Sequence, residues 1–232
     1  MANGVLSRLR TRVQKGWNTL RRLCRHPLTR DQRLRTLARY GTLQVTTRMS
    51  ESPTIVPFVE DTRIALHSNS GSNRYEVAVG LFESEEMVFV LHALRPSFLF
   101  VYVGANVRFY TVLAGGGVGA SCLSLEPVPV TFDQLRTNVR LNELEENVDL
   151  RNVRVGAETG TLRFTDGAGA NNRVVTEAEQ TGIEVPVTAL DTLFDADREG
   201  MIVIKIRLTW RAGRRRLCRA QNRRSADPAF SR

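Results

Sequence analysis

The sequence lacks several of the patterns by which proteins are most easily classified. It has only three cysteines, Cys24, Cys122 and Cys218, which are far apart and form no CxxC pair, and only three histidines. This spacing favours reduced thiols over a disulfide framework and offers no metal-ligand cluster. No apolar run reaches the roughly 18 residues of a membrane-spanning helix, and the N-terminus has no apolar core of a secretory signal. We therefore expect a cytoplasmic protein without a bound metal.

Acidic residues are almost absent from both ends of the chain. Residues 1–48 carry 12 Lys and Arg against one acid, and residues 207–232 carry nine Arg against one acid. Residues 49–206 carry 12 basic and 22 acidic residues, so this central part is acidic although the 232-residue chain has a formal net charge of +9. A nucleic-acid-binding domain usually carries its basic residues on a folded face. The distribution therefore argues against specific nucleic-acid binding as the main function.

The basic N-terminal segment has the pattern of an amphipathic helix over residues 5–24. Apolar residues recur there at spacings of three and four, and basic residues occupy many of the other positions. The apolar positions are Leu6, Leu9, Val13, Trp17, Leu20 and Cys24. Such a helix either packs on its own domain, which is the favoured interpretation, or makes peripheral contact with an anionic membrane.

Residues 1–40 are assigned to this basic helical extension, and a β-rich segment is predicted after it. A second short helix completes the extension, with Leu34, Leu37 and Ala38 expected to face inward. Over residues 41–80, the stretches LQVTTRM and ALHSNS are rich in β-branched and alternating residues. This composition predicts strands.

From residue 81 onward the pattern alternates between helices and strands. FESEEMVFVLHAL predicts a helix that ends at the following Arg-Pro pair. FLFVYV is a short continuous apolar run, which is typical of a strand covered on both faces. ASCLSLE, NVDLRNVRVG and the buried run MIVIKI predict further strands, and VTFDQLRTNVRLNEL predicts a helix. The alternation implies a parallel sheet, so residues 81–206 are predicted to form a Rossmann-like α/β core.

The candidate ligand-binding residues stand at the ends of these strands, where open α/β sheets bind ligands. Gly104 opens the turn Gly104-Ala105-Asn106 after the first strand and lets the backbone approach a ligand. Glu126 ends the next strand 22 residues later, where a carboxylate can accept both ribose hydroxyls. Gly156 follows the third strand and leaves room for a base. Since GANVRF lacks the GxGxxG cradle for a pyrophosphate, S-adenosylmethionine is favoured over a dinucleotide.

Several collinear motifs resemble those of FkbM-type methyltransferases over roughly residues 80–206. They read VYVGANVRFYTVLA, LSLEPVPVTFDQLRTNVRLNEL, NVDLRNVRVGAETGTLRF, VPVTALDTL and VIKI. The resemblance implies a class I methyltransferase fold, which is incomplete here, with S-adenosylmethionine as cofactor. It also implies O-methylation of a hydroxyl group on a sugar or another small molecule, so the expected partner is a small-molecule or glycan acceptor.

The resemblance also implies roles for individual residues. The turn at residues 104–106 would line the methionine side of the cofactor. Glu126, followed by Pro127, would hold the ribose, and the loop at Gly156 would lie near the adenine. The resemblance leaves the catalytic residue unassigned.

Three positions depart from the family's pattern. The first motif of the family reads acid-x-Gly-Ala-Asn-x-Gly, but Tyr102 replaces the acid here and Arg108 replaces the second glycine. Tyr102 cannot supply a negative charge to a cationic cofactor. Arg108 either brings a positive charge near the sulfonium or points outward. After VIKI the family has Asp-Val-Glu-Gly, whereas residues 207–212 of this chain read RLTWRA.

The third departure has two interpretations. One codon set for Leu-Thr-Trp-Arg-Ala, CTG ACG TGG AGG GCC, encodes Asp-Val-Glu-Gly when its first two bases are skipped, which indicates a reading-frame shift near Ile206. The alternative is a genuine basic tail over residues 207–232. The gene sequence downstream of Lys205 distinguishes the two. In either case the strand at 201–206 would be an uncovered sheet edge, an aggregation hazard, and stability and activity would be low.

A second class of function competes with catalysis. An acidic α/β body with basic ends could act as a non-catalytic binding protein that attaches to a membrane or to nucleic acid. Saturable binding of S-adenosylmethionine would support the methyltransferase, and its absence would support the binding protein.

Overall fold

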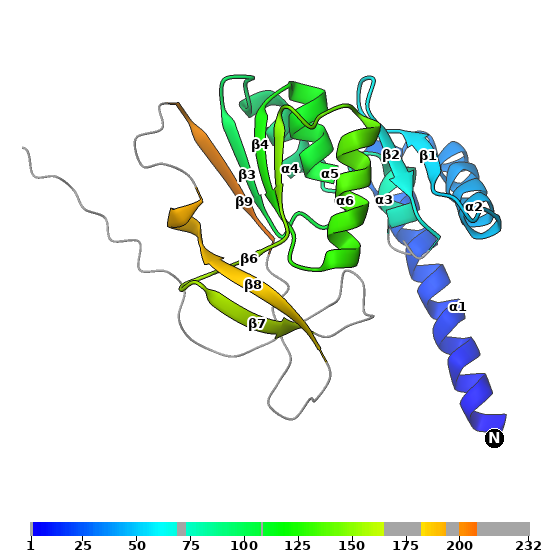
Figure 1. The fold of residues 1–232 in the computed structure, drawn as a ribbon. Helices are drawn as coiled ribbons and strands as arrows, with labels where there is room; N and C mark the ends of the chain where they lie inside the picture. The colour runs from blue at the N-terminus through cyan, green and yellow to red at the C-terminus, as the bar shows by residue number, and fades with distance from the viewer. Residues whose placement is uncertain (1, 69–72, 108, 165–181, 194–199, 208–232) are drawn as a thin grey trace, which may run out of the picture.

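A computed structural model of the chain describes residues 2–68, 73–107, 109–164, 182–193 and 200–207 (Figure 1). The expectations for Arg108, Cys218 and the basic segment after Arg207 concern residues outside these ranges. No helix within the described ranges has the length and apolar character that a bilayer span requires.

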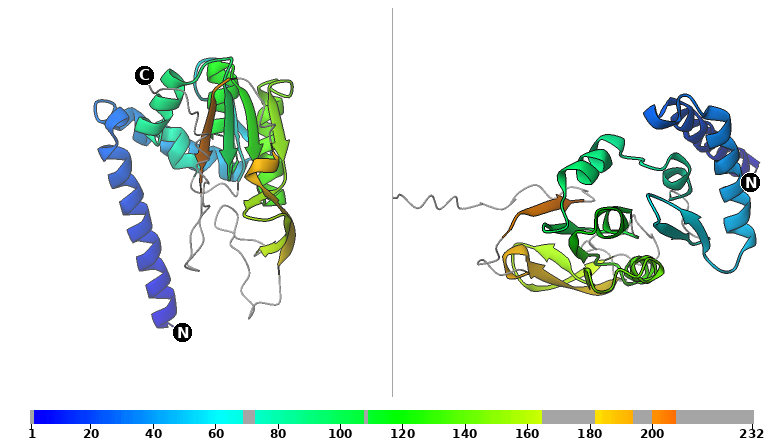
Figure 2. Two further views of the ribbon diagram at one scale, coloured as in Figure 1. Left: turned by 90° about the vertical axis from the view of Figure 1, so that its left-hand side faces the viewer. Right: turned by 90° about the horizontal axis from the view of Figure 1, so that it is seen from above.

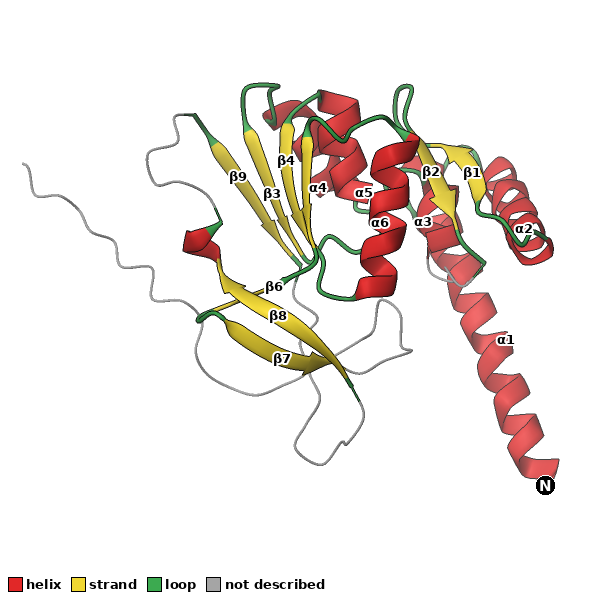
Figure 3. Ribbon diagram, in the orientation of Figure 1, coloured by secondary structure: helices red, strands yellow, loops and turns green. Residues whose placement is uncertain are grey.

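A four-stranded parallel sheet forms the centre of the fold (Figure 3). Its strands are β3 (Leu99–Val103), β4 (Ser121–Leu125), β5 (Val148–Arg151) and β9 (Ile202–Ile206). They lie in the order β5-β4-β3-β9, with every neighbouring pair parallel. This is the 3-2-1-4 order that begins a doubly wound Rossmann-like sheet. The predicted α/β fold with a parallel sheet is therefore confirmed.

Strand β3 is buried on both faces because all five of its residues are apolar or aromatic. Phe100 and Tyr102 point to one face, where they join the larger hydrophobic core. Leu99, Val101 and Val103 point to the other face and join a smaller core. An uninterrupted apolar run is what a strand with two covered faces requires.

Helices cover the larger core on one face of the sheet (Figure 2). They are α4 (Ser84–Ala93), α5 (Phe109–Val112), the π-helix η2 (Leu113–Val118) that continues α5, and α6 (Pro129–Leu141). The two helices predicted over FESEEMVFVLHAL and VTFDQLRTNVRLNEL are thus present as α4 and α6, and α6 starts on a proline, as the first helical turn favours. Leu135 and Val139 are buried at a four-residue spacing on α6.

A second, three-stranded sheet packs beside the opposite face. It contains β6 (Arg154–Gly156), β7 (Gly160–Phe164) and β8 (Ile183–Ala189) in the order β6-β8-β7, and β8 leads into the 3-10 helix η4 (Leu190–Thr192). The prediction of one strand over NVDLRNVRVG is wrong, because this segment is split between β5 and β6 in two different sheets. The physical reason is Asn152, whose side chain bonds to the main chain after β4 and turns the chain away from the first sheet.

The N-terminal part adds three helices and a hairpin. The helices are α1 (Ala2–Arg25), α2 (Arg33–Met49) and α3 (Asn73–Val79), with the 3-10 helix η1 (Pro27–Thr29) between the first two. Strands β1 (Thr54–Pro57) and β2 (Arg63–Leu66) form an antiparallel pair.

The strand predicted over residues 43–49 is wrong, because these residues form the second half of α2. The threonines that favour strands here satisfy their hydroxyls inside the helix instead. Thr46 Oγ1 donates to Thr42 O at 3.0 Å, and Thr47 Oγ1 donates to Leu43 O at 2.6 Å. Tertiary packing therefore overrides local propensity, since Leu43 and Thr47 are both buried.

Two expectations about burial are also wrong. Leu34 is 84% exposed rather than inward, and Ala38 is exposed as well. Strand β9 is not fully buried, since Ile204 is 42% exposed and Ile206 is 53% exposed. Within the described residues, β9 has no partner on its outer edge.

Asn138 provides a test of the packing between α6 and the hairpin. Its fully buried side chain accepts from Ala65 N at 2.8 Å and donates to Gln134 O at 2.8 Å. We expect Asn138→Ala to lower the free energy of unfolding by about 2 kcal/mol, because it leaves a buried N–H without an acceptor. Urea denaturation measures this loss. Thr137→Ala, at the neighbouring exposed position, is the control, and an equal loss in both variants would contradict the prediction.

Candidate functional site

The turn after β3 is fixed to the end of β4. Gly104 N and Ala105 N both donate to Leu125 O at 2.9 Å. Gly104 has φ of +74° and Asn106 has φ of +54°, so two residues of this turn adopt the left-handed conformation. Asn106 tolerates this conformation better than most residues, and its Oδ1 accepts from Val107 N at 2.8 Å.

The end of β9 passes close to the same turn. Arg207 N donates to Val103 O at 2.9 Å, and a Cβ on Gly104 would lie 2.5 Å from Arg207 O. Gly104 is therefore required both by its backbone conformation and by this close approach. The turn lies between β4 on one side and β9 on the other, where the order of the sheet reverses.

The Glu126 carboxylate points at this turn. Its Oε2 accepts from Asn106 N at 2.7 Å, and its Oε1 accepts from Val128 N at 3.0 Å. The side chain comes from the end of β4 and the residue is only 6% exposed. The structure thus brings Glu126 together with the turn of Gly104, Ala105 and Asn106, as the meeting of parallel strand ends predicts.

Burial raises the pKa of Glu126 to about 7, although the N–H groups of Val128 and Asn106 and the positive charge of Arg207 act in the opposite direction. A carboxylate has about four acceptor positions, and backbone N–H groups use two of them here. Among the described residues, no further donor bonds to this carboxylate.

Asn152 is a positioning residue that the sequence interpretation missed. Its Nδ2 donates to Glu126 O at 2.7 Å and to Pro127 O at 3.1 Å, which fixes the loop that carries the carboxylate. The available signal was an asparagine inside a predicted strand, since asparagine is depleted in strands.

Gly156 lies at the end of β6 in the second sheet, where it pairs with Ala189. A Cβ on Gly156 would lie 2.5 Å from Val187 Cγ1, so packing against β8 accounts for this glycine. The contact of Gly156 with an adenine stays a prediction.

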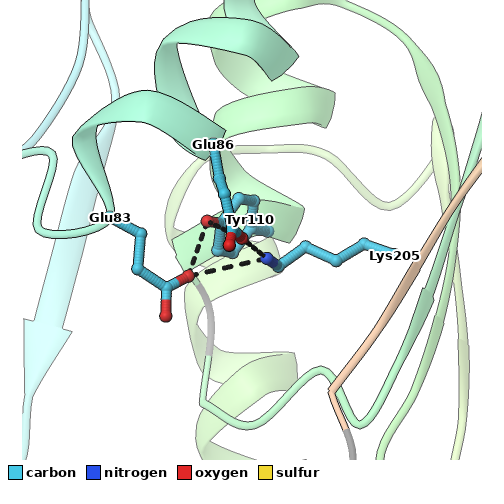
Figure 4. Close-up of polar contacts among 4 residues, drawn as sticks. All are labelled: Glu83, Glu86, Tyr110 and Lys205. Carbon is cyan, nitrogen blue, oxygen red and sulfur yellow. Dashed lines mark hydrogen bonds and ion pairs between the residues drawn. The ribbon is translucent and has the colours of Figure 1, made fainter.

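A polar cluster of Glu83, Glu86, Tyr110 and Lys205 joins α4, α5 and β9 (Figure 4). Tyr110 OH donates to Glu83 Oε2 at 2.6 Å, and Lys205 forms an ion pair with Glu86. The Lys205 Nζ lies 4.1 Å from the centroid of the Tyr110 ring. Hydrogen bonding to Lys205 lowers the pKa of Glu86, and burial with the bond to Glu83 raises the pKa of Tyr110. Tyr110 is therefore a neutral donor in this cluster.

Tyr102 connects the cluster to the turn. Its ring centroid lies 5.4 Å from that of Tyr110, and on the sheet it pairs with Lys205. Burial raises the pKa of the Tyr102 phenol, and the positive charge of Arg207 acts against this rise. Arg207 therefore places a cation near both Glu126 and Tyr102. Tyr102 is the residue that replaces the acid of the family pattern. Within the described residues, no group of His, Cys, Asp and Glu side chains is placed to hold a metal ion.

Comparison with known proteins finds no matching family model and no matching curated protein. Among solved structures, TYW2 of P. horikoshii in complex with MeSAdo has a TM-score of 0.34 at 16% identity, over 56% of this chain and 50% of that chain. TYW2 of M. jannaschii in complex with AdoMet has a TM-score of 0.34 at 18% identity, over 44% of this chain and 43% of that one.

A SAM-dependent methyltransferase from Agrobacterium tumefaciens has a TM-score of 0.36 at 10% identity, over 47% of this chain and 34% of that chain. The chain thus spans half or less of the length of these three structures.

The raised pKa of Glu126 predicts a pH-dependent stability. Because the pKa lies at about 7 in the folded chain against an ordinary value of 4.5, the folded state binds the proton more tightly. The stability that Glu126 contributes is then fully present below about pH 4.5 and is lost as the pH rises through about 7. We expect the wild-type chain to lose about 2 kcal/mol more than Glu126→Gln between pH 5 and 8. Urea denaturation at both pH values checks this, and parallel profiles would contradict it.

Proposed function

We propose that the chain is an S-adenosylmethionine-dependent methyltransferase of the FkbM type. The acceptor would be a hydroxyl oxygen of a sugar or another small molecule. The observation that carries this proposal is the Glu126 carboxylate, which is buried at the end of β4 and bonded to the backbone of the turn after β3. The motifs shared with that family and the 3-2-1-4 order of the sheet support it.

The cofactor would lie at the carboxyl ends of β3 and β4, where open α/β sheets bind ligands. The two ribose hydroxyls would donate to the free acceptor positions of Glu126, and the methionine part would follow the turn of Gly104, Ala105 and Asn106. The adenine would lie towards the loop after β5, which Asn152 positions. When bound, the cofactor supplies a sulfonium methyl group, and the protein's part is to align that group with the acceptor oxygen.

The charges on the β9 side of the turn favour a ligand without a positive charge. Tyr102 stands where the family has an acid, and Arg207 adds a cation nearby. Lys205 is compensated by Glu83 and Glu86, and Arg207 lies near Glu83 and Glu76, but Tyr102 supplies no negative charge next to the turn. We therefore infer that the nucleoside part is held well and the sulfonium is held poorly, which lowers the activity.

Removal of the Glu126 charge tests the proposed ribose contact. We expect Glu126→Gln to weaken binding of S-adenosylhomocysteine by about ten-fold or more, because two charge-assisted hydrogen bonds become weaker ones. Isothermal titration calorimetry at pH 8 measures the dissociation constants. The control is Glu145→Gln, which removes an exposed carboxylate on the loop after α6. Equal affinities in all three proteins would refute the contact.

Removal of the Arg207 charge tests the inference about the sulfonium. In the wild-type chain we expect S-adenosylhomocysteine, which lacks the positive charge, to bind more tightly than S-adenosylmethionine. Arg207→Gln should lower the ratio of the dissociation constant of S-adenosylmethionine to that of S-adenosylhomocysteine by about three- to ten-fold, since it removes a like charge from the site. Arg140→Gln on the exposed face of α6 should leave the ratio unchanged. If this ratio of dissociation constants is the same in Arg207→Gln as in the wild-type chain, the inference is contradicted.

The second candidate is a non-catalytic binding protein whose basic ends attach to a membrane or to nucleic acid. The exposed basic helix α1 favours it. If neither cofactor form binds while the chain still binds anionic vesicles or RNA, this candidate replaces the first. The expected cytoplasmic location stays a prediction in either case.

A further inference from the structure

Among the described residues, helix α1 contacts the body near its C-terminal end. Leu23 is 1% exposed and belongs to the main core. The Arg22 guanidinium lies 4.6 Å from the centroid of the Tyr75 ring, and His26 Nε2 lies 3.1 Å from Phe82 O. The helix has 24 residues, and its N-terminal part runs away from the other described helices and strands (Figures 1 and 2).

The projecting part carries an exposed apolar stripe. Val13, Trp17 and Leu20 are 70%, 64% and 40% exposed, and their spacing of four and then three residues puts them on one face. The sequence continues this spacing towards the N-terminus at Leu6 and Leu9. Single exposed apolar residues are normal on a protein surface. A tryptophan and two aliphatic side chains next to one another on a helix form a larger apolar patch than that.

The charge of the same helix indicates what covers this stripe. The helix contains seven Lys and Arg and no Asp or Glu. Exposed arginines border the stripe, since Arg21 follows Trp17 by four residues and Arg10 precedes Val13 by three. An apolar stripe with basic borders is complementary to an anionic lipid surface, where the apolar side chains enter the acyl boundary and the guanidinium groups meet phosphates.

We propose that α1 is a membrane-docking helix that lies on an anionic bilayer surface along the stripe of Val13, Trp17 and Leu20. Other occupants fit less well. RNA would neutralise the arginines but leave the stripe in water. A second copy of the chain would cover the stripe but would bring the positive charges of two such helices together. The proposal does not depend on the cofactor site, which lies on the parallel sheet.

A pair of substitutions with the same change in net charge tests the proposal. Val13→Glu places an acid in the stripe, and Asn18→Glu places one on the opposite, polar face of the same helix. Both positions are exposed, so both variants should keep the wild-type melting temperature. The assay is co-sedimentation of the full chain with vesicles of phosphatidylcholine alone and of phosphatidylcholine with phosphatidylserine.

We expect the wild-type chain to bind the vesicles that contain phosphatidylserine and not those of phosphatidylcholine alone. Asn18→Glu should weaken this binding by about five-fold, the effect of one charge. Val13→Glu should weaken it by about ten-fold more, because apolar burial is also lost. In a Trp210→Phe background, the emission of Trp17 should shift to shorter wavelength on vesicle binding.

Three results would overturn the proposal. Equal losses in Val13→Glu and Asn18→Glu would mean that the stripe does not enter the bilayer. Failure to bind vesicles, with retention of a single-stranded RNA oligonucleotide, would assign the helix to RNA. Self-association in analytical ultracentrifugation that Val13→Glu abolishes would assign the stripe to a second copy of the chain.

Discussion

The fold brings one buried carboxylate to the point where three strands end, and the candidate site depends on it. Glu126 is 6% exposed, and an ionised carboxylate at such a position is costly unless hydrogen-bond donors surround it. The N–H groups of Asn106 and Val128 supply two donors, and Asn152 holds the adjoining main chain from the end of β5. The left-handed conformation of Asn106 and the position of Glu126 are thus set together.

The residues around the strand ends form two regions of different charge. Around Glu126 the surroundings suit a neutral ligand that carries hydroxyl donors. Towards β9, Lys205 and Arg207 bring positive charge. Lys205 forms ion pairs with Glu83 and Glu86, and the negative charges of Glu83 and Glu76 also act on Arg207. Under the proposed function, this arrangement would separate recognition of a nucleoside from stabilisation of a cationic methyl donor, so the chain could retain one property while it loses the other.

The sequence predicts those parts of the fold in which local pattern and tertiary environment agree. The apolar run of β3 and the helical spacing of α6 lead directly to the parallel sheet. Because parallel strands end on one edge, the meeting of Glu126 with the turn at Gly104 could also be anticipated. In contrast, the threonine-rich half of α2 resembles a strand, and only packing of Leu43 and Thr47 makes it a helix. The contact of Lys205 with Glu86 joins residues far apart in sequence, which no local pattern records.

The most direct test of the central claim is a crystal structure of the chain soaked with S-adenosylhomocysteine. The account predicts that both ribose hydroxyls lie within about 3 Å of the Glu126 carboxylate oxygens. A nucleoside bound elsewhere, with Glu126 still contacting only the backbone of Asn106 and Val128, would contradict it.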